Sequence, residues 1–286
     1  MPIPTPAEQV KSLSPEQKRR LFQKYMRTGR LSAISMNLHL DASGCDDWSD
    51  RSDPWYILVC VVTRSSHRWK TYVQWHDQLP GGRLHLSERA GRKKADRYSQ
   101  AHTAISFDAG EYVFAQVVHR STFCSYFSET PPERPSGQPE SHWRAEFLWT
   151  SFLGVVISVV RNDDGAATIG SHPISKIVVN NPGRGRAAER ALIEPLTAWI
   201  HAPPTVAFVS GGHPGIDLAD TYAWSIRRYL THGSIEQFPF EVSLKHPRLA
   251  MQIGAAGRQI PCPTLADLKK HAVSLEPTAC REKSAG

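Results

Sequence analysis

Acidic residues stand at two places where an α/β sheet could bring them together. Asp41 follows the strand-like run Ser35–Leu40, in the sequence MNLHLDASG, and active sites of α/β sheets favour the carboxyl ends of strands. Asp217 and Asp220 lie three residues apart in HPGIDLADTYAWSIRRYL, which follows the strand-like TVAFVS. On a helix, this spacing places both side chains on one face near the N-terminus. Because hard divalent cations prefer carboxylate oxygens, the three acids are candidate metal ligands.

Each of these acids also has an ordinary structural explanation. Asp41 could start a turn, for which Ser43 and Gly44 supply suitable residue types. Acids in the first turn of a helix interact favourably with its dipole, and Asp217 could be the N-cap. Capping explains Asp217 better than Asp220. The preceding loop, SGGHPG, could hold a phosphate, although a Gly/Pro turn between strand and helix is the more common explanation.

The elements that must position these residues alternate along the chain. Strand-like runs are Ser35–Leu40, Trp55–Thr63, Tyr112–His119, Ile174–Asn180 and Thr205–Ser210. Helix-like runs are Ser66–Gln78, Ser87–Thr103, His142–Arg161, Gly185–His201 and Asp217–Leu230. This alternation predicts an α/β fold with a buried central sheet and helices on its faces.

Composition excludes several classes of protein. The 286 residues are 40% hydrophobic and 9% aromatic, which excludes a disordered or fibrous chain. The longest apolar runs, Trp55–Thr63 and Phe147–Val160, fall short of the roughly 20 residues that a membrane-spanning helix needs, so we expect no membrane partner. The N-terminus lacks the apolar region of a signal peptide, and the five scattered cysteines lack a Cys-x-x-Cys pair. These features predict a cytoplasmic protein with reduced thiols.

Positive charge gathers on three segments of a chain whose net charge is +7. Residues 1–35 hold seven basic and two acidic residues, and Arg83–Arg97 holds six basic and two acidic residues. The loop PGRGRAAER holds three arginines. A nucleic-acid partner, RNA or DNA, would be held by such side chains. The candidate contacts are Arg19, Arg20, Arg92, Lys93, Lys94, Arg184 and Arg186. For the first segment, a solvated helix face is the more frequent explanation of the charge alone.

We expect three parts in the chain. A basic helical arm over residues 1–35 precedes an α/β domain over 36–231, and a C-terminal extension covers 232–286. The helix of the arm is predicted to begin at Ser14 as N-cap, with Pro15 at the first helical position and Gln17 in the capping box. Gly29 is the predicted stop.

Two short motifs together resemble the domain-of-unknown-function family 3800. They are Asp-Ala-Ser-Gly at Asp41–Gly44, after the first strand, and Gly-Ile-Asp-Leu-Ala-Asp-Thr-Tyr-Ala-Trp at Gly215–Trp224, which opens the last core helix. Members of the family open with Asp-Glu-Ser-Gly and carry Gly-Leu-Gln-Leu-Ala-Asp before a helix. The order of elements over Met36–Leu230 is also similar. The resemblance implies a ribonuclease-H-like fold, a mixed central sheet flanked by helices.

The resemblance also implies a nuclease-like site. Asp41 and Asp220 match the family's acidic positions, and with Asp217 they would bind Mg²⁺ or Mn²⁺ to hydrolyse phosphodiester bonds. His85, in RLHLS, resembles the family's Glu-Leu-His segment. It could shuttle a proton or contact a phosphate, although a lone histidine is more often structural.

The sequence departs from the family at several acidic positions. The acid after Asp41 is replaced by Ala42, and the glutamate before the histidine segment is replaced around Arg83–Leu84. Asn180 and Asn181 end the strand where ribonuclease-H-like sites often carry another aspartate. Asparagine can ligate a cation but brings no charge, so affinity for a hard divalent ion should drop.

Two functions are therefore open. The first is a metal-dependent nuclease that uses Asp41, Asp220 and Asp217. The second is a catalytically degenerate nucleic-acid-binding or scaffold subunit of a larger complex, with a possible protein partner. Metal binding by these acids distinguishes the two functions, since only the nuclease requires a metal.

Overall fold

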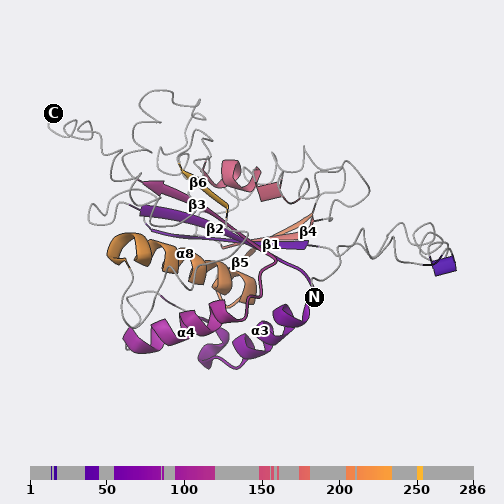
Figure 1. Ribbon diagram of the computed structural model, residues 1–286, viewed down its shortest axis with the longest axis horizontal. Coiled ribbons are helices and arrows are strands. Elements are labelled where there is room, and N and C mark those ends of the chain that lie inside the picture. Colours follow the sequence, from indigo (N-terminus) through magenta and orange to yellow (C-terminus); the bar gives the residue numbers. More distant parts are fainter. Residues whose placement is uncertain are drawn as a thin grey trace.

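The computed structural model describes a central sheet and the helices packed on it (Figure 1). The described residues are 14, 16–17, 36–44, 55–84, 86, 94–119, 148–154, 156–157, 160, 174–180, 204–209, 211–233 and 250–253. Several predictions fall outside these residues: His85, Asn181, Arg19, Arg20, Arg92, Lys93, Arg184, Arg186, the side chain of Lys94 and the helix over Gly185–His201.

Six described strands form one sheet in the order β5-β4-β1-β2-β3-β6. Their bounds are β1 Met36–Ser43, β2 Trp55–Thr63, β3 Tyr112–His119, β4 Ile174–Asn180, β5 Thr205–Val209 and β6 Ala250–Ile253. Strand β2 is antiparallel to both of its neighbours, whereas β1 and β4, β4 and β5, and β3 and β6 pair in parallel. This order, with one reversed strand beside β1, is that of the ribonuclease-H-like fold. The predicted fold class is confirmed.

Helices cover both faces of the sheet. Helices α3 (His67–Asp77), α4 (Lys94–Ser106) and α8 (Pro214–His232) lie on one face, and helical residues between 148 and 160 lie on the other (Figure 1). A short 3-10 helix, η1 (Pro80–Gly82), follows α3. Strand β2 is buried along its whole length, as a strand covered on both faces must be.

Helix α8 is the element that carries two of the predicted acids. It packs against β2 and β1, and its side chains Ala219, Ala223 and Trp224 are buried in the core on this face. Nineteen residues long, α8 lies against the sheet close to β1 (Figure 1). This packing therefore determines where Asp217 and Asp220 lie relative to the strands of the sheet.

Several predicted boundaries were wrong. The first strand does not end at Leu40: residues up to Ser43 pair with β2, so Asp41 lies inside the strand. Helix α8 begins at Pro214, with His213 as N-cap accepting a hydrogen bond from the Gly215 amide, so Asp217 is not the N-cap. Helix α4 ends at Ser106, and β6 comes from a segment for which no element was predicted.

The predicted capping box and the predicted start of the helix at Ser66 are confirmed. Ser14 and Gln17 exchange the two hydrogen bonds of a capping box, at 2.8 and 3.2 Å. Helix α3 follows Ser66, whose hydroxyl accepts from the Trp69 amide. Cys60 is a buried free thiol, and burial raises its pKa, as expected of an inert cysteine. Within the described residues, no helix is both long and apolar enough to cross a bilayer.

Candidate functional site

Strand β1 carries a column of polar side chains on the face that α8 covers. Alternation along the strand places Leu38 and Leu40 in the core on the opposite face, so His39, Asp41 and Ser43 point toward α8. Arg227 of α8 donates from Nη1 to the Ser43 hydroxyl at 3.4 Å. The predicted acid Asp41 is therefore in the layer between the sheet and the helix that carries the other acids.

Asp41 is buried, with 5% of its surface exposed. Its Oδ1 accepts hydrogen bonds from Asn180 Nδ2 at 2.8 Å and from the Ala42 amide at 2.7 Å. Burial raises the pKa of Asp41 to about 7, and the negative charge of Asp217 adds to the increase. The two hydrogen bonds and the positive charge of Arg83 act in the opposite direction. Near neutral pH, Asp41 is consequently poised between its protonated and ionised forms.

Asp220, the second acid of the site, is partly buried. Burial raises the pKa of Asp220 well above its usual value, and the charges of Asp41 and Asp217 raise it further. Arg83 again lowers it. Among the described residues, none donates a hydrogen bond to the Asp220 carboxylate or to Oδ2 of Asp41. The structure thus brings the three predicted acids within electrostatic range, and oxygens of two of them accept no hydrogen bond from the described residues.

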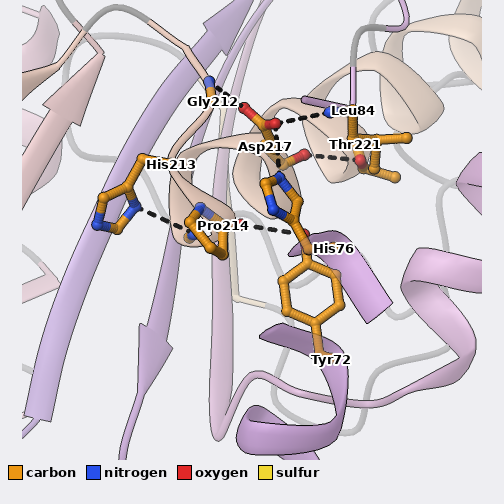
Figure 2. Close-up of polar contacts among 9 residues, drawn as sticks. Tyr72, His76, Leu84, Gly212, His213, Pro214, Asp217 and Thr221 are labelled. Carbon is orange, nitrogen blue, oxygen red and sulfur yellow. Dashed lines mark hydrogen bonds and ion pairs between the residues drawn. The ribbon is translucent and has the colours of Figure 1, made fainter. Parts of the chain in front are cut away.

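Asp217 has different surroundings, because its carboxylate is held by three protein donors (Figure 2). Oδ2 accepts from His76 Nε2 at 2.8 Å and from the Leu84 amide at 2.7 Å, and Oδ1 accepts from the Gly212 amide at 3.2 Å. The backbone carbonyl of the same residue accepts from the Thr221 hydroxyl at 2.7 Å. Asp217 therefore ties α3, the segment after η1 and the glycine loop to the start of α8.

A histidine of β1 sets how closely α8 approaches the sheet. His39 Nε2 is 3.0 Å from the Thr63 hydroxyl, and its ring stacks on Trp69 with centroids 5.5 Å apart. Burial, with the nearby His213 and a lysine, lowers the pKa of His39 to about 3, so the ring is neutral. A Cβ atom at Gly215 would lie 2.1 Å from His39 Nδ1, so only glycine fits there. This close approach brings α8, and with it Asp220, down to β1.

Sequence reasoning missed His39, His76 and Arg83. The signal for His39 is its position two residues before Asp41, which places both on one face of a strand. His76 follows Tyr72 by four residues, and both are buried on the inner face of α3. Arg83 was counted within a basic cluster, and nothing in that cluster singles out the arginine whose charge lowers the pKa of Asp41 and Asp220.

A metal ion at this site would have few protein ligands. Among the described residues, no three His, Cys, Asp or Glu side chains gather closely enough to hold one ion. Asp41 and Asp220 each have an oxygen without a donor among the described residues, and burial, which disfavours their charged forms, raises the pKa of both. Mg²⁺ is commonly held by one or two carboxylates together with waters and substrate phosphates, so this pair fits such an ion.

No protein-family model matches the chain, and no curated protein matches its sequence. Among solved structures, the ribonuclease H2 from Pyrococcus horikoshii OT3 is similar, with 9% sequence identity and a TM-score of 0.37. The match covers 71% of this chain and 91% of that one.

Proposed function

We propose that this protein is a divalent-metal-dependent hydrolase of phosphodiester bonds in RNA or DNA. The observation that carries the proposal is the pair of carboxylates, Asp41 from β1 and Asp220 from α8: burial raises the pKa of both, and the charge of Asp41 raises the pKa of Asp220 further. Like charges in a poorly solvated site repel each other, and a bound cation offsets that repulsion. The arrangement is typical of a metal-binding site rather than of a structural contact.

Mg²⁺ or Mn²⁺ is the proposed cofactor, and Asp41 and Asp220 are its proposed protein ligands. When bound, such an ion would polarise a phosphate oxygen and lower the pKa of a water molecule. Asn180 and the Ala42 amide orient Asp41 through Oδ1, which leaves Oδ2 directed elsewhere. In this proposal Asp217 is a positioning residue, because its oxygens are already bound by protein donors.

Nucleic acid is the proposed substrate because an excess of positive charge accompanies this acidic site. The chain has a net charge of +7, and anionic polymers are attracted to such a surface. We further propose membership of the domain-of-unknown-function family 3800, on the two motifs that contain Asp41 and Asp220. A cytoplasmic location is part of the same proposal.

A second candidate function follows from Asn180 and Arg83. The amide of Asn180 occupies the end of β4 beside Asp41, and Arg83 supplies positive charge to both acids. Both features stabilise the acids without a metal. They would suit a degenerate site in a nucleic-acid-binding subunit of a larger complex.

Calorimetry with Mn²⁺ and a cleavage assay on labelled single-stranded and duplex RNA and DNA test the proposal together. The wild type should bind metal and cut, and Asp41→Asn/Asp220→Asn should do neither while remaining folded by circular dichroism. Asp77→Asn is the matched control, since Asp77 is an exposed acid at the end of α3. If the wild type binds no metal but holds nucleic acid in a salt-dependent way, the second function replaces the first.

A further inference from the structure

Arg83 lies where two segments that hold the Asp217 carboxylate meet. It follows η1, and the next residue, Leu84, donates its backbone amide to Asp217 at 2.7 Å, so the start of this segment is anchored to α8. The guanidinium lies directly on Gly211: a Cβ atom there would be 2.5 Å from Arg83 Cζ and 2.7 Å from both Nε and Nη2. Gly211 also has a φ of +65°, so a side chain at this position would be both strained and in collision with the guanidinium.

The guanidinium has no partner among the described residues, although its charge reaches both acids. Arg83 is exposed, and neither a hydrogen bond nor an ion pair joins it to another described side chain. Its charge lowers the pKa of Asp41 and of Asp220. Two other described arginines are paired: Arg64 with Glu111 and Arg68 with Asp108. Within the described part of the chain, the planar set of N–H donors of Arg83 is therefore not engaged.

A phosphodiester group is the ligand that this arrangement fits. Two carboxylates repel an anion, and a substrate phosphate must nevertheless come close to them if they hold its metal. A guanidinium beside the carboxylates offsets the repulsion, and its geometry matches two phosphate oxygens at once. The glycine at 211 leaves one face of the guanidinium in contact with backbone, which limits the directions in which its donors point.

We propose that Arg83 binds the backbone phosphate of the nucleic acid and positions it against Asp41 and Asp220. The inference rests on the proposed function, because it takes the acidic pair to be the reacting end of the site. Arg83 is then a substrate-positioning residue rather than an internal counter-ion of the acids.

Binding without cleavage tests this assignment. Fluorescence anisotropy with labelled 20-nucleotide single-stranded RNA and DNA, in EDTA and over a series of salt concentrations, compares the wild type with Arg83→Gln. We expect Arg83→Gln to bind about tenfold more weakly and to lower the slope of log K against log salt by about 0.7. Arg83→Lys should keep the slope and still lose affinity, since lysine keeps the charge without the paired donors. Arg68→Gln is the control, because it also removes one positive charge, and it should bind nucleic acid like the wild type.

The outcomes separate this inference from the proposed function. If Arg83→Gln binds both nucleic acids like Arg68→Gln, with only a lower melting temperature, Arg83 is a counter-ion and the inference is overturned, whether or not the wild type cuts. If Arg83→Gln loses affinity and slope while the wild type fails to cleave with Mn²⁺, the assignment of Arg83 holds and the nuclease proposal fails. Circular dichroism of Arg83→Lys shows whether the fold is kept when Arg83→Gln is unstable.

Discussion

His76 and Asp217 are 141 residues apart in the sequence and meet in a buried contact, with Nε2 and Oδ2 separated by 2.8 Å. The contact joins α3 to the first turns of α8, and Tyr72 strengthens the same joint by donating its hydroxyl to the Pro214 carbonyl at 3.0 Å (Figure 2). Because Asp217 also accepts two backbone amides, one carboxylate fixes three segments. The position of α8, which carries Asp220, therefore depends on the hydrogen bonds of the Asp217 carboxylate.

Replacement of Asp217 by alanine should destabilise the fold. The Leu84 amide and His76 Nε2 would lose their acceptor inside the protein, and buried donors without partners cost about 1–3 kcal/mol each. We expect Asp217→Ala to lower the free energy of unfolding by about 2–4 kcal/mol in urea denaturation. The exposed Asp77→Ala is the control. A loss below about 0.5 kcal/mol, the range of ordinary surface substitutions, would contradict the positioning role.

Gly215 should tolerate no side chain as long as His39 is present. A methyl group would overlap the His39 ring, and such overpacking typically costs about 1–3 kcal/mol. We expect Gly215→Ala to lower the melting temperature and to weaken Mn²⁺ binding, because α8 must move away from Asp41. The measurement is thermal unfolding together with calorimetry.

The double variant Gly215→Ala/His39→Ala supplies the decisive comparison for this contact. Removal of the imidazole makes room for the methyl group, so part of the lost stability should return and the two substitutions should not be additive. Gly154→Ala is the matched control, since no atom lies within 4 Å of the position where its Cβ would stand. Additive losses would show that the collision with His39 is not the cause.

How far the sequence predicted the fold depended on what each pattern encodes. The apolar runs predicted the bounds of β2 and β3 correctly, because buried side chains extend along nearly the whole of both strands. The bound of β1 was too short, since the polar Asp41 and Ser43 interrupt the apolar pattern while backbone pairing to β2 continues. The alternation of apolar and polar residues reports which face each side chain occupies. It does not report how far the backbone pairing of a strand continues.

The candidate site was predicted only in part, because the sequence shows on which element a residue lies but not which distant segments contact it. Asp41 and Asp220 were found from their positions at a strand and a helix, and the structure brings them within electrostatic range. The spacing of Asp217 and Asp220 suggested equal roles, yet contacts from distant segments engage the oxygens of Asp217. Arg83 could not be singled out, because its place depends on the packing of two glycine loops far apart in the sequence.

Stability should fall as the pH rises from about 4 to about 7. The pKa of Asp41 is raised from 3.8 to about 7 in the folded state, so the folded protein keeps a proton that the unfolded chain has released. Its contribution to stability is present below pH 4 and is lost as the pH rises through 7. We expect Asp41→Asn to be more stable than the wild type by about 1–3 kcal/mol at pH 8, measured by urea denaturation in EDTA. Equal pH profiles for the two proteins would contradict the raised pKa.

Asn180→Asp should convert a hydrogen bond into a third negative charge beside Asp41. Asn180 Nδ2 donates to Asp41 Oδ1 at 2.8 Å, so the substitution removes a donor and brings two carboxylates together. Without metal, we expect the free energy of unfolding at pH 8 to drop by about 1–3 kcal/mol, because buried like charges repel. With Mn²⁺, the added carboxylate supplies the charge that asparagine lacks, and the dissociation constant from calorimetry should fall about tenfold. Asn37→Asp is the control, because it makes the same chemical change on β1, the strand of Asp41. Asn37 Oδ1 accepts a hydrogen bond from the Ser175 hydroxyl and none from the acids, so this variant should keep the metal affinity of the wild type. If Asn180→Asp loses stability and gains no affinity for Mn²⁺, the end of β4 is not part of a metal site, and the proposal of a nuclease loses its structural basis there.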